Sequence, residues 1–167
     1  KKAILFSIIS LPFMMPSLAV IGMGSARSDL GESVTSVLGI PGFPMSSPFS
    51  HRGSEILGVF EKGQKTRAFR MVKRWRKEDK QSELPLIVRG ILHFQNGQFK
   101  KCLSWNKKAL KLSPAHADAY FWRGRAFEAL GKPLEAANEY RAVLMVTPDH
   151  AAAQEGLNRA LAQLRNE

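Results

Sequence analysis

The stretch RGRAFEALGKPLEAANEYRAVLMVTPDH, residues 123–150, repeats the pattern of RGILHFQNGQFKKCLSWNKKALKLSPAH, residues 89–116. The apolar residues in both stretches recur with the spacing of one helix face, interrupted by regular breaks. An internal repeat built from helices is therefore the first prediction of the sequence. The identical pairs are Arg89 and Arg123, Gly90 and Gly124, Gly97 and Gly131, Leu110 and Leu144, Pro114 and Pro148, and His116 and His150.

The repeated glycines occupy two kinds of position. Gly90 and Gly124 fall in the middle of a predicted helix, where glycine costs about 1 kcal/mol relative to alanine unless a neighbouring helix must approach closely. Gly97 and Gly131 fall at the predicted turn between two helices, where a positive φ suits glycine. The proline of each unit ends the second helix. Each unit is thus predicted to be a helix hairpin.

This pattern resembles the tetratricopeptide repeat (TPR) family, which has a period of about 34 residues, small residues where its two helices cross, and a terminal proline. The resemblance implies an all-α fold, an α-solenoid of helix hairpins, with repeats at 83–116 and 117–150. The second repeat carries the fuller signature, at Tyr120, Gly124, Phe127, Gly131, Ala136, Tyr140 and Pro148. The first repeat departs from the usual aromatic, apolar or alanine positions at Leu86, His93, Asn106 and Cys102.

The period extends in both directions. Upstream, Gly63 lies one repeat period before Gly97, so we expect a degenerate, basic repeat at 54–82 with helices near 54–62 and 65–80; the alternative is an unrelated basic helix. Downstream, residues 151–167 are predicted to be a capping helix. Its apolar face would hold Ala153, Leu157, Ala160, Leu161 and Leu164. Two clear repeats, one degenerate repeat and a cap reach the minimum for a stable solenoid.

The amino-terminal segment predicts the compartment. Lys1 and Lys2 precede a run that has no charge before Arg27, which is typical of a secretory signal peptide. We expect residues 1–19 to be a signal peptide cleaved after Ala19, or else an uncleaved membrane anchor. Either alternative makes the protein exported, periplasmic or membrane-anchored with its bulk on the extracytoplasmic side.

Residues 20–53 are rich in glycine, proline and serine and are predicted to be a flexible linker. The net charge of +11 favours anionic partners. The single cysteine, Cys102, excludes an intramolecular disulfide and a cysteine-based zinc cluster.

No catalytic constellation emerges from the sequence. The four histidines lack metal-ligand spacing, and no serine or cysteine has a local base. We therefore expect a non-catalytic protein without metal or cofactor, acting as an interaction scaffold or assembly factor.

The resemblance implies a binding groove on the concave wall, lined by the first helix of each repeat. The chaperone-tail version of that groove clamps a terminal carboxylate with Lys, Arg and Asn, but the matching places here are Ile87, Ile91 and Phe121, so we expect no such clamp. An apolar groove suits a peptide or helix of a protein partner with hydrophobic anchors. The expected groove residues are Ile87, Ile91, Phe94, Phe121, Arg125 and Glu128.

A second candidate surface lies in residues 61–80, which hold nine Lys or Arg against three Asp or Glu. As a helix, this stretch would fan basic side chains around an apolar strip of Ala68, Val72 and Trp75 with Met71, a pattern that fits an anionic membrane surface, an acidic protein or another polyanion. Nucleic acid would be an unusual partner for an exported protein. The alternative is a solvated repeat face. The basic residues of this surface are Arg67, Arg70, Lys73, Arg74 and Lys77.

Overall fold

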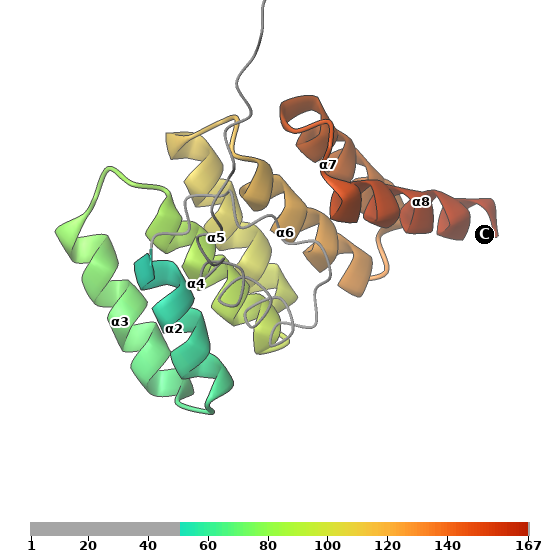
Figure 1. The fold of residues 1–167 in the computed structure, drawn as a ribbon. Helices are drawn as coiled ribbons and strands as arrows, with labels where there is room; N and C mark the ends of the chain where they lie inside the picture. The colour runs from blue at the N-terminus through green and yellow to red at the C-terminus, as the bar shows by residue number, and fades with distance from the viewer. Residues whose placement is uncertain (1–50, 167) are drawn as a thin grey trace, which may run out of the picture.

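The computed structural model describes residues 51–166. The predicted signal or anchor segment 1–19 and nearly all of the predicted linker lie outside the described residues. The described part consists of α-helices without a strand. Figure 1 shows the helices following one another from α2 to α8 as a stack of hairpins. Their bounds are α2 His51–Glu61, α3 Lys65–Glu78, α4 Leu84–Gln95, α5 Phe99–Leu112, α6 Ala117–Ala129, α7 Pro133–Val146 and α8 Ala151–Arg165.

The predicted fold class is confirmed. Each helix packs against the next one in the chain, and α4 also contacts α2 and α6, while α6 also contacts α8. The first helices of successive hairpins therefore form one layer, and the second helices cover it, as in an α-solenoid. Each hairpin shields the apolar side of its neighbour.

A glycine closes each of the three hairpins. Gly63, Gly97 and Gly131 have φ of 79°, 71° and 67°, and no other described residue has a positive φ. The N–H of each glycine donates to a carbonyl three residues earlier, so the chain reverses within one turn. Because Gly63 takes this role one repeat period before Gly97, the α2–α3 pair repeats the geometry of the later hairpins.

The crossing point of the second repeat holds an aromatic ring. A Cβ atom at Gly124 would lie 2.8 Å from Cε1 of Tyr140, and one at Gly156 would lie 2.5 Å from Cζ of the same ring. Tyr140 is fully buried between these two glycines, which belong to α6 and α8. Glycine is needed at both positions because the backbone lies directly against the ring.

The same crossing in the first repeat holds a polar side chain. A Cβ at Gly90 would lie 2.5 Å from Nδ2 of Asn106, the counterpart of Tyr140. That amide donates to the Cys102 carbonyl at 3.0 Å, whereas Oδ1 of Asn106 is buried without a hydrogen bond. In the α2–α3 hairpin the equivalent places are taken by Ile56 and Val72, both fully buried.

The first helix begins earlier than the composition predicts. The described residues of α2 include His51, Arg52 and Gly53, which belong to the segment 20–53 that was expected to be a linker. In this part of α2, the Arg52 guanidinium forms an ion pair with Glu78 and lies 5.6 Å from the Trp75 ring. Within residues 51–166, no helix combines the length and apolar composition needed to cross a bilayer.

Candidate functional site

The six predicted groove residues separate into two groups by exposure. Ile87 and Ile91 have no exposed surface and Phe121 is 2% exposed, so these three are core residues of the folded chain. The other three are half-buried on α4 and α6, the first helices of the two clear repeats: Phe94, Arg125 and Glu128.

Phe121 is held by aromatic neighbours on three sides. Its ring centroid lies 5.8 Å from that of Trp122, 6.0 Å from that of Tyr140 and 5.0 Å from that of His150. His150 also caps α8, because its Nδ1 accepts a hydrogen bond from the Ala153 N–H at 3.2 Å. Phe121 thus fastens α8 to the second repeat, a role that a sequence-based groove assignment did not foresee.

Phe94, Arg125 and Trp122 form one cluster across the seam between the two repeats, which we call the seam cluster. The Arg125 guanidinium lies 5.3 Å from the Phe94 ring and 5.8 Å from the Trp122 ring. The two rings meet edge to face with centroids 5.3 Å apart. Such cation–π contacts orient a guanidinium without using its N–H groups. Within residues 51–166, Arg125 makes no hydrogen bond or ion pair.

Glu128 is already engaged by two partners. It accepts a hydrogen bond from the Tyr140 hydroxyl at 2.7 Å and from Nε of Arg159 at 2.8 Å. Burial alone would raise the pKa of Glu128, but the hydrogen bonds from Arg159 and Tyr140 outweigh it and lower the pKa below the ordinary 4.5. Glu128 therefore holds α8 in place and has little capacity left for a ligand.

Arg159 was not foreseen as part of this wall, although the repeat period contains the signal. A shift by one period pairs Arg125 with Arg159 and Phe94 with Glu128. The same two repeat positions thus meet at successive seams, as a cation–π contact between α4 and α6 and as an ion pair between α6 and α8. The donors of Arg159 are used by a carboxylate, whereas a ring leaves the donors of Arg125 free for another molecule.

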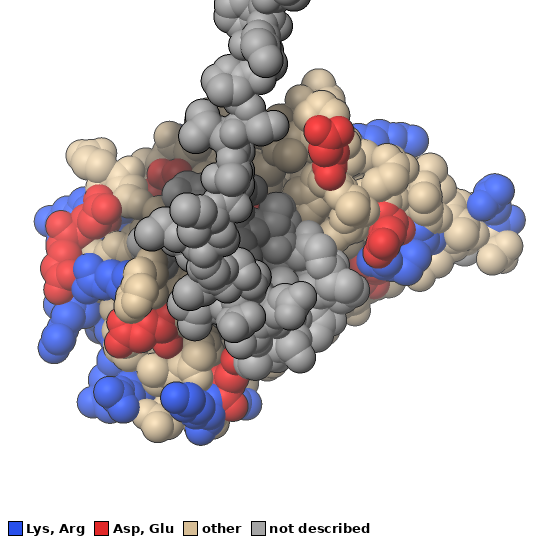
Figure 2. Space-filling view, viewed as in Figure 1, with Lys and Arg blue, Asp and Glu red and all other residues tan. Residues whose placement is uncertain are grey.

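The predicted basic residues all lie on the exposed side of α3: Arg67, Arg70, Lys73, Arg74 and Lys77. Figure 2 shows Lys and Arg side chains gathered over α2 and α3, with acidic side chains between them. The apolar strip of the same helix faces the other way, because Ala68 and Val72 have no exposed surface and Trp75 is 5% exposed. That strip belongs to the protein core and offers no surface to a bilayer.

The described residues hold no group of three or more His, Cys, Asp or Glu that could bind a metal ion. The Cys102 thiol is buried against α6, where its Sγ donates to the Trp122 carbonyl at 3.6 Å. Burial raises the pKa of this thiol to about 12, so it stays protonated and unreactive near neutral pH.

The tetratricopeptide repeat family model matches residues 117–150. This segment therefore matches one tetratricopeptide repeat in sequence. The repeat predicted from the sequence has the same bounds, and the structure places its two helices, α6 and α7, as a hairpin. No curated protein matches the chain closely enough to count as a relative.

Solved TPR domains share the fold of this chain. The first TPR domain of Spaghetti (RPAP3) bound to the HSP90 peptide SRMEEVD is 23% identical, with a TM-score of 0.62, over 70% of this chain and 95% of that one. The second TPR domain of human RPAP3 in complex with the HSP70 peptide SGPTIEEVD is 23% identical, with a TM-score of 0.58, over 65% and 91%. The Sgt2 TPR domain from Aspergillus fumigatus is 16% identical, with a TM-score of 0.62, over 68% and 76%.

Proposed function

We propose that this protein is a non-catalytic scaffold or assembly factor that binds a peptide or helix of a partner protein along the wall formed by α4 and α6. The observation that carries this proposal is the seam cluster. It joins a half-buried aromatic ring to a guanidinium that lies 5.3 Å from the ring centroid and makes no hydrogen bond within residues 51–166. A surface of this kind combines an apolar contact with a directed polar one, which is how peptide grooves gain affinity and register.

The chemistry of the cluster indicates what the partner presents. Phe94 would contact an apolar side chain, and Arg125 would donate to a carboxylate or backbone carbonyl next to it. Because the guanidinium already contacts two rings, we expect that binding would restrict it little further. Ile87, Ile91 and Phe121 would support the wall from within the core, and Glu128 would hold the neighbouring α8.

The similar solved structures support peptide binding, but the peptides bound in them differ from the ligand that we propose for this chain. Two of them hold chaperone peptides that end in EEVD. This chain has Ile87, Ile91 and Phe121 where a carboxylate clamp would need polar side chains, and all three are buried. We therefore propose that recognition depends on an apolar anchor rather than on a free chain terminus. A labelled SRMEEVD peptide should bind weakly, and equally well with its carboxyl terminus free or amidated. Tight binding that needs the free carboxylate would contradict this choice of ligand.

The proposal is tested by affinity capture of the full chain from its native envelope fraction, with identification of partners by mass spectrometry. A variant carrying Phe94→Ala and Arg125→Ala should lose a partner that the parent protein captures. Arg141→Ala is the matched control, because it removes one exposed arginine of α7 and should keep the partner. Thermal melting must show that the double variant is folded. Capture that is unchanged in a folded double variant would refute binding at the seam cluster.

The same proposal places the protein outside the cytoplasm, exported to the periplasm or anchored in the membrane. Its support is the sequence of residues 1–26, where two lysines precede an uncharged apolar run. A reporter enzyme that is active only outside the cytoplasm, fused after Glu167, should be active in cells. Removal of residues 1–19 should abolish that activity. A fusion that stays inactive with the complete chain would exclude this location.

A further inference from the structure

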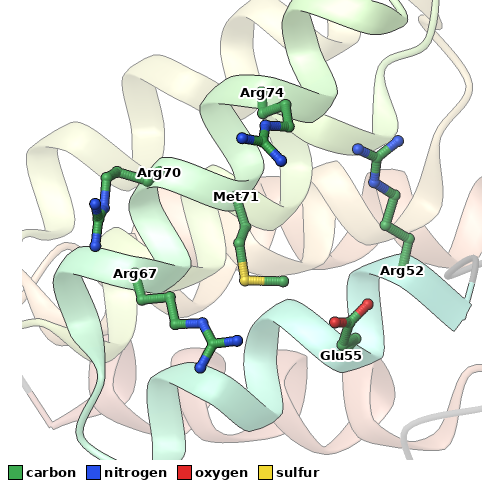
Figure 3. A pocket seen from close by; sticks show the side chains of 6 residues that line it. All are labelled: Arg52, Glu55, Arg67, Arg70, Met71 and Arg74. Atoms are coloured by element: carbon green, nitrogen blue, oxygen red, sulfur yellow. The ribbon is translucent and has the colours of Figure 1, made fainter.

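A basic hollow of about 420 Å³ lies between α2 and α3, on a different pair of helices from the seam cluster. Figure 3 shows Met71 between Arg67 and Arg74, with Arg52 and Glu55 facing it from α2, while Arg70 points to the other side of α3. We call this site the arginine hollow. Its lining residues are Arg52, Glu55, Arg67, Arg70, Met71 and Arg74.

The cations of the hollow differ in what they already bind. Arg52 is paired with Glu78, and Arg67 donates to Oε1 of the Gln64 side chain at 2.9 Å. Arg70 and Arg74 form no ion pair or hydrogen bond with any described residue. Two guanidinium groups are thus unpaired, and a third is held only by a neutral amide.

The kind of cation also matters. Every basic residue that lines the hollow is an arginine, although lysines are frequent elsewhere on α3. The planar guanidinium fork matches the two oxygens of a carboxylate, whereas a lysine ammonium acts as a point charge. Met71 adds a flexible apolar floor that adapts to the shape of an inserted side chain. The site therefore offers charge and an apolar contact within one depression.

The geometry distinguishes a protein segment from a membrane. A helix that lies on a bilayer inserts an apolar face between its basic residues, but Ala68, Val72 and Trp75 of α3 are buried in the core. Only Met71 is partly exposed at the centre of the basic side, and it lies at the bottom of a hollow. A depression admits single side chains and gives a flat headgroup surface few contacts.

We propose that the arginine hollow binds an acidic segment of a partner protein, with Asp or Glu carboxylates on Arg67 and Arg74 and an adjacent apolar side chain on Met71. Arg70 would pair with a further carboxylate across α3. Glu55 repels acidic groups from the α2 side, so the acidic residues would follow α3. This binding site is independent of the seam cluster and does not need it.

The probe is a fluorescein-labelled peptide in which glutamates flank one central leucine, titrated with the full chain at low and high salt. The test variant carries Arg67→Glu and Arg74→Glu. The control variant carries Lys100→Glu and Lys107→Glu, which change the net charge equally at exposed places on α5. We expect the test variant to bind at least about tenfold more weakly than the parent, which corresponds to about 1.4 kcal/mol, and the control to stay within about twofold. Salt should weaken the parent's binding.

Two further arms separate the possible sources of negative charge. A peptide with glutamine in place of each glutamate should not bind, and Met71→Ser should weaken the glutamate peptide while the charge is unchanged. Binding to vesicles containing phosphatidylserine should fall equally in the test and control variants, because both lose the same net charge. Equal losses in the test and control variants would show that net charge alone attracts the peptide and would overturn the proposal. Vesicle binding that depends on Arg67 and Arg74, without peptide binding, would also overturn it in favour of a membrane surface.

Discussion

The repeats at 83–116 and 117–150 share a period and a hairpin but fill the crossing of their helices differently. In the second repeat, Gly124 lies against the Tyr140 ring, which also touches Gly156 and whose hydroxyl donates to Glu128. In the first repeat, Gly90 lies against the Asn106 carboxamide, and the oxygen of this group is buried without a hydrogen-bond partner. The comparison teaches that the glycine fixes the distance between the helices, while the side chain opposite it decides how firmly the crossing is held.

The contacts between successive hairpins also differ. An ion pair from Glu128 to Arg159 fastens α8 to α6, whereas the cation–π contact between Phe94 and Arg125 joins α6 to α4. At the seam between α6 and α8, Glu128 and Arg159 bind each other. The first seam leaves guanidinium donors free, and we place the peptide contact there.

The largest effect is expected from Gly124→Ala. The new Cβ would lie 2.8 Å from Tyr140, and the ring is blocked on its other side by Gly156, so it cannot move away. We expect a loss of about 3 kcal/mol in the free energy of unfolding, measured by urea denaturation. Gly90→Ala should cost about half as much, because the Asn106 carboxamide is smaller and is the end of a side chain.

Gly58→Ala is the matched control for both substitutions. Gly58 lies inside α2 with no atom within 4 Å of an added Cβ. It should therefore raise the free energy of unfolding by about 0.5 to 1 kcal/mol through helix propensity. Equal losses at Gly90 and Gly124 would mean that the two crossings do not differ as described.

The next largest effect is expected from Glu128→Gln, which weakens the bonds from Tyr140 and Arg159. Hydrogen bonds to a charged group contribute about 1.5 to 3 kcal/mol, and partial exposure reduces this, so we expect a loss of about 1 kcal/mol at pH 7. Because the pKa of Glu128 is lowered in the folded state, its stabilising contribution is present above the ordinary 4.5 and is lost as the pH falls below it.

The measurement is the difference in stability between the parent protein and the Glu128→Gln variant as a function of pH. The difference should shrink below pH 4.5. A difference that is the same on both sides of this value would contradict a charged Glu128 as the link to α8.

Asn106→Leu should stabilise the first crossing. The substitution keeps the branched shape and removes a buried oxygen that has no hydrogen bond, a group whose burial costs about 1 to 3 kcal/mol. The gain should be about 1 kcal/mol after the loss of the bond to the Cys102 carbonyl, seen as a higher midpoint of thermal unfolding. A lower midpoint would show that the polar bond outweighs the unpaired oxygen.

Much of this architecture could be predicted from the sequence because it depends on local signals. The repeat period locates both clear hairpins, Gly97 and Gly131 mark their turns, and Gly90 and Gly124 indicate the close crossings. The start of the first helix could not be predicted. The composition of residues 51–53 favours a linker, whereas the contacts of Arg52 with Glu78 and Trp75 are made by side chains far away in the sequence.

The site was harder to predict than the fold because exposure depends on neighbours in space. Ile87, Ile91 and Phe121 hold repeat positions that face the concave side, yet the folded chain buries them. Glu128 looks like a ligand contact until Arg159, 31 residues away, is seen to pair with it. The arginine hollow likewise combines residues of two helices, so no single stretch of the sequence contains it.

The smallest effect concerns His93, which packs between the Phe69 and Trp105 rings of the neighbouring helices. Burial lowers the pKa of His93 below the ordinary 6.5, and the charges of Arg89 and Lys101 act in the same direction, although the hydrogen bond with Gln98 opposes them. The unfolded chain therefore binds a proton more readily, and stability should fall slightly as the pH drops below 6.5.

His93→Phe gives the first repeat the residue that the second repeat has at the equivalent position, Phe127, and should remove that decrease. Midpoints of thermal unfolding at about pH 7.5 and about pH 5.5 give the comparison. A decrease of the same size in His93→Phe would assign the acid sensitivity to another group.

The central claim is that a glycine admits the opposing side chain at the crossing of each clear repeat, and a double-mutant cycle at Gly124 and Tyr140 tests it most directly. The measured quantity is the cost of Gly124→Ala in the parent protein and in a Tyr140→Val background, where the atoms that meet the new Cβ are absent. We predict a cost of about 3 kcal/mol in the parent and close to zero in the Tyr140→Val variant. Equal costs in the two backgrounds would contradict the account.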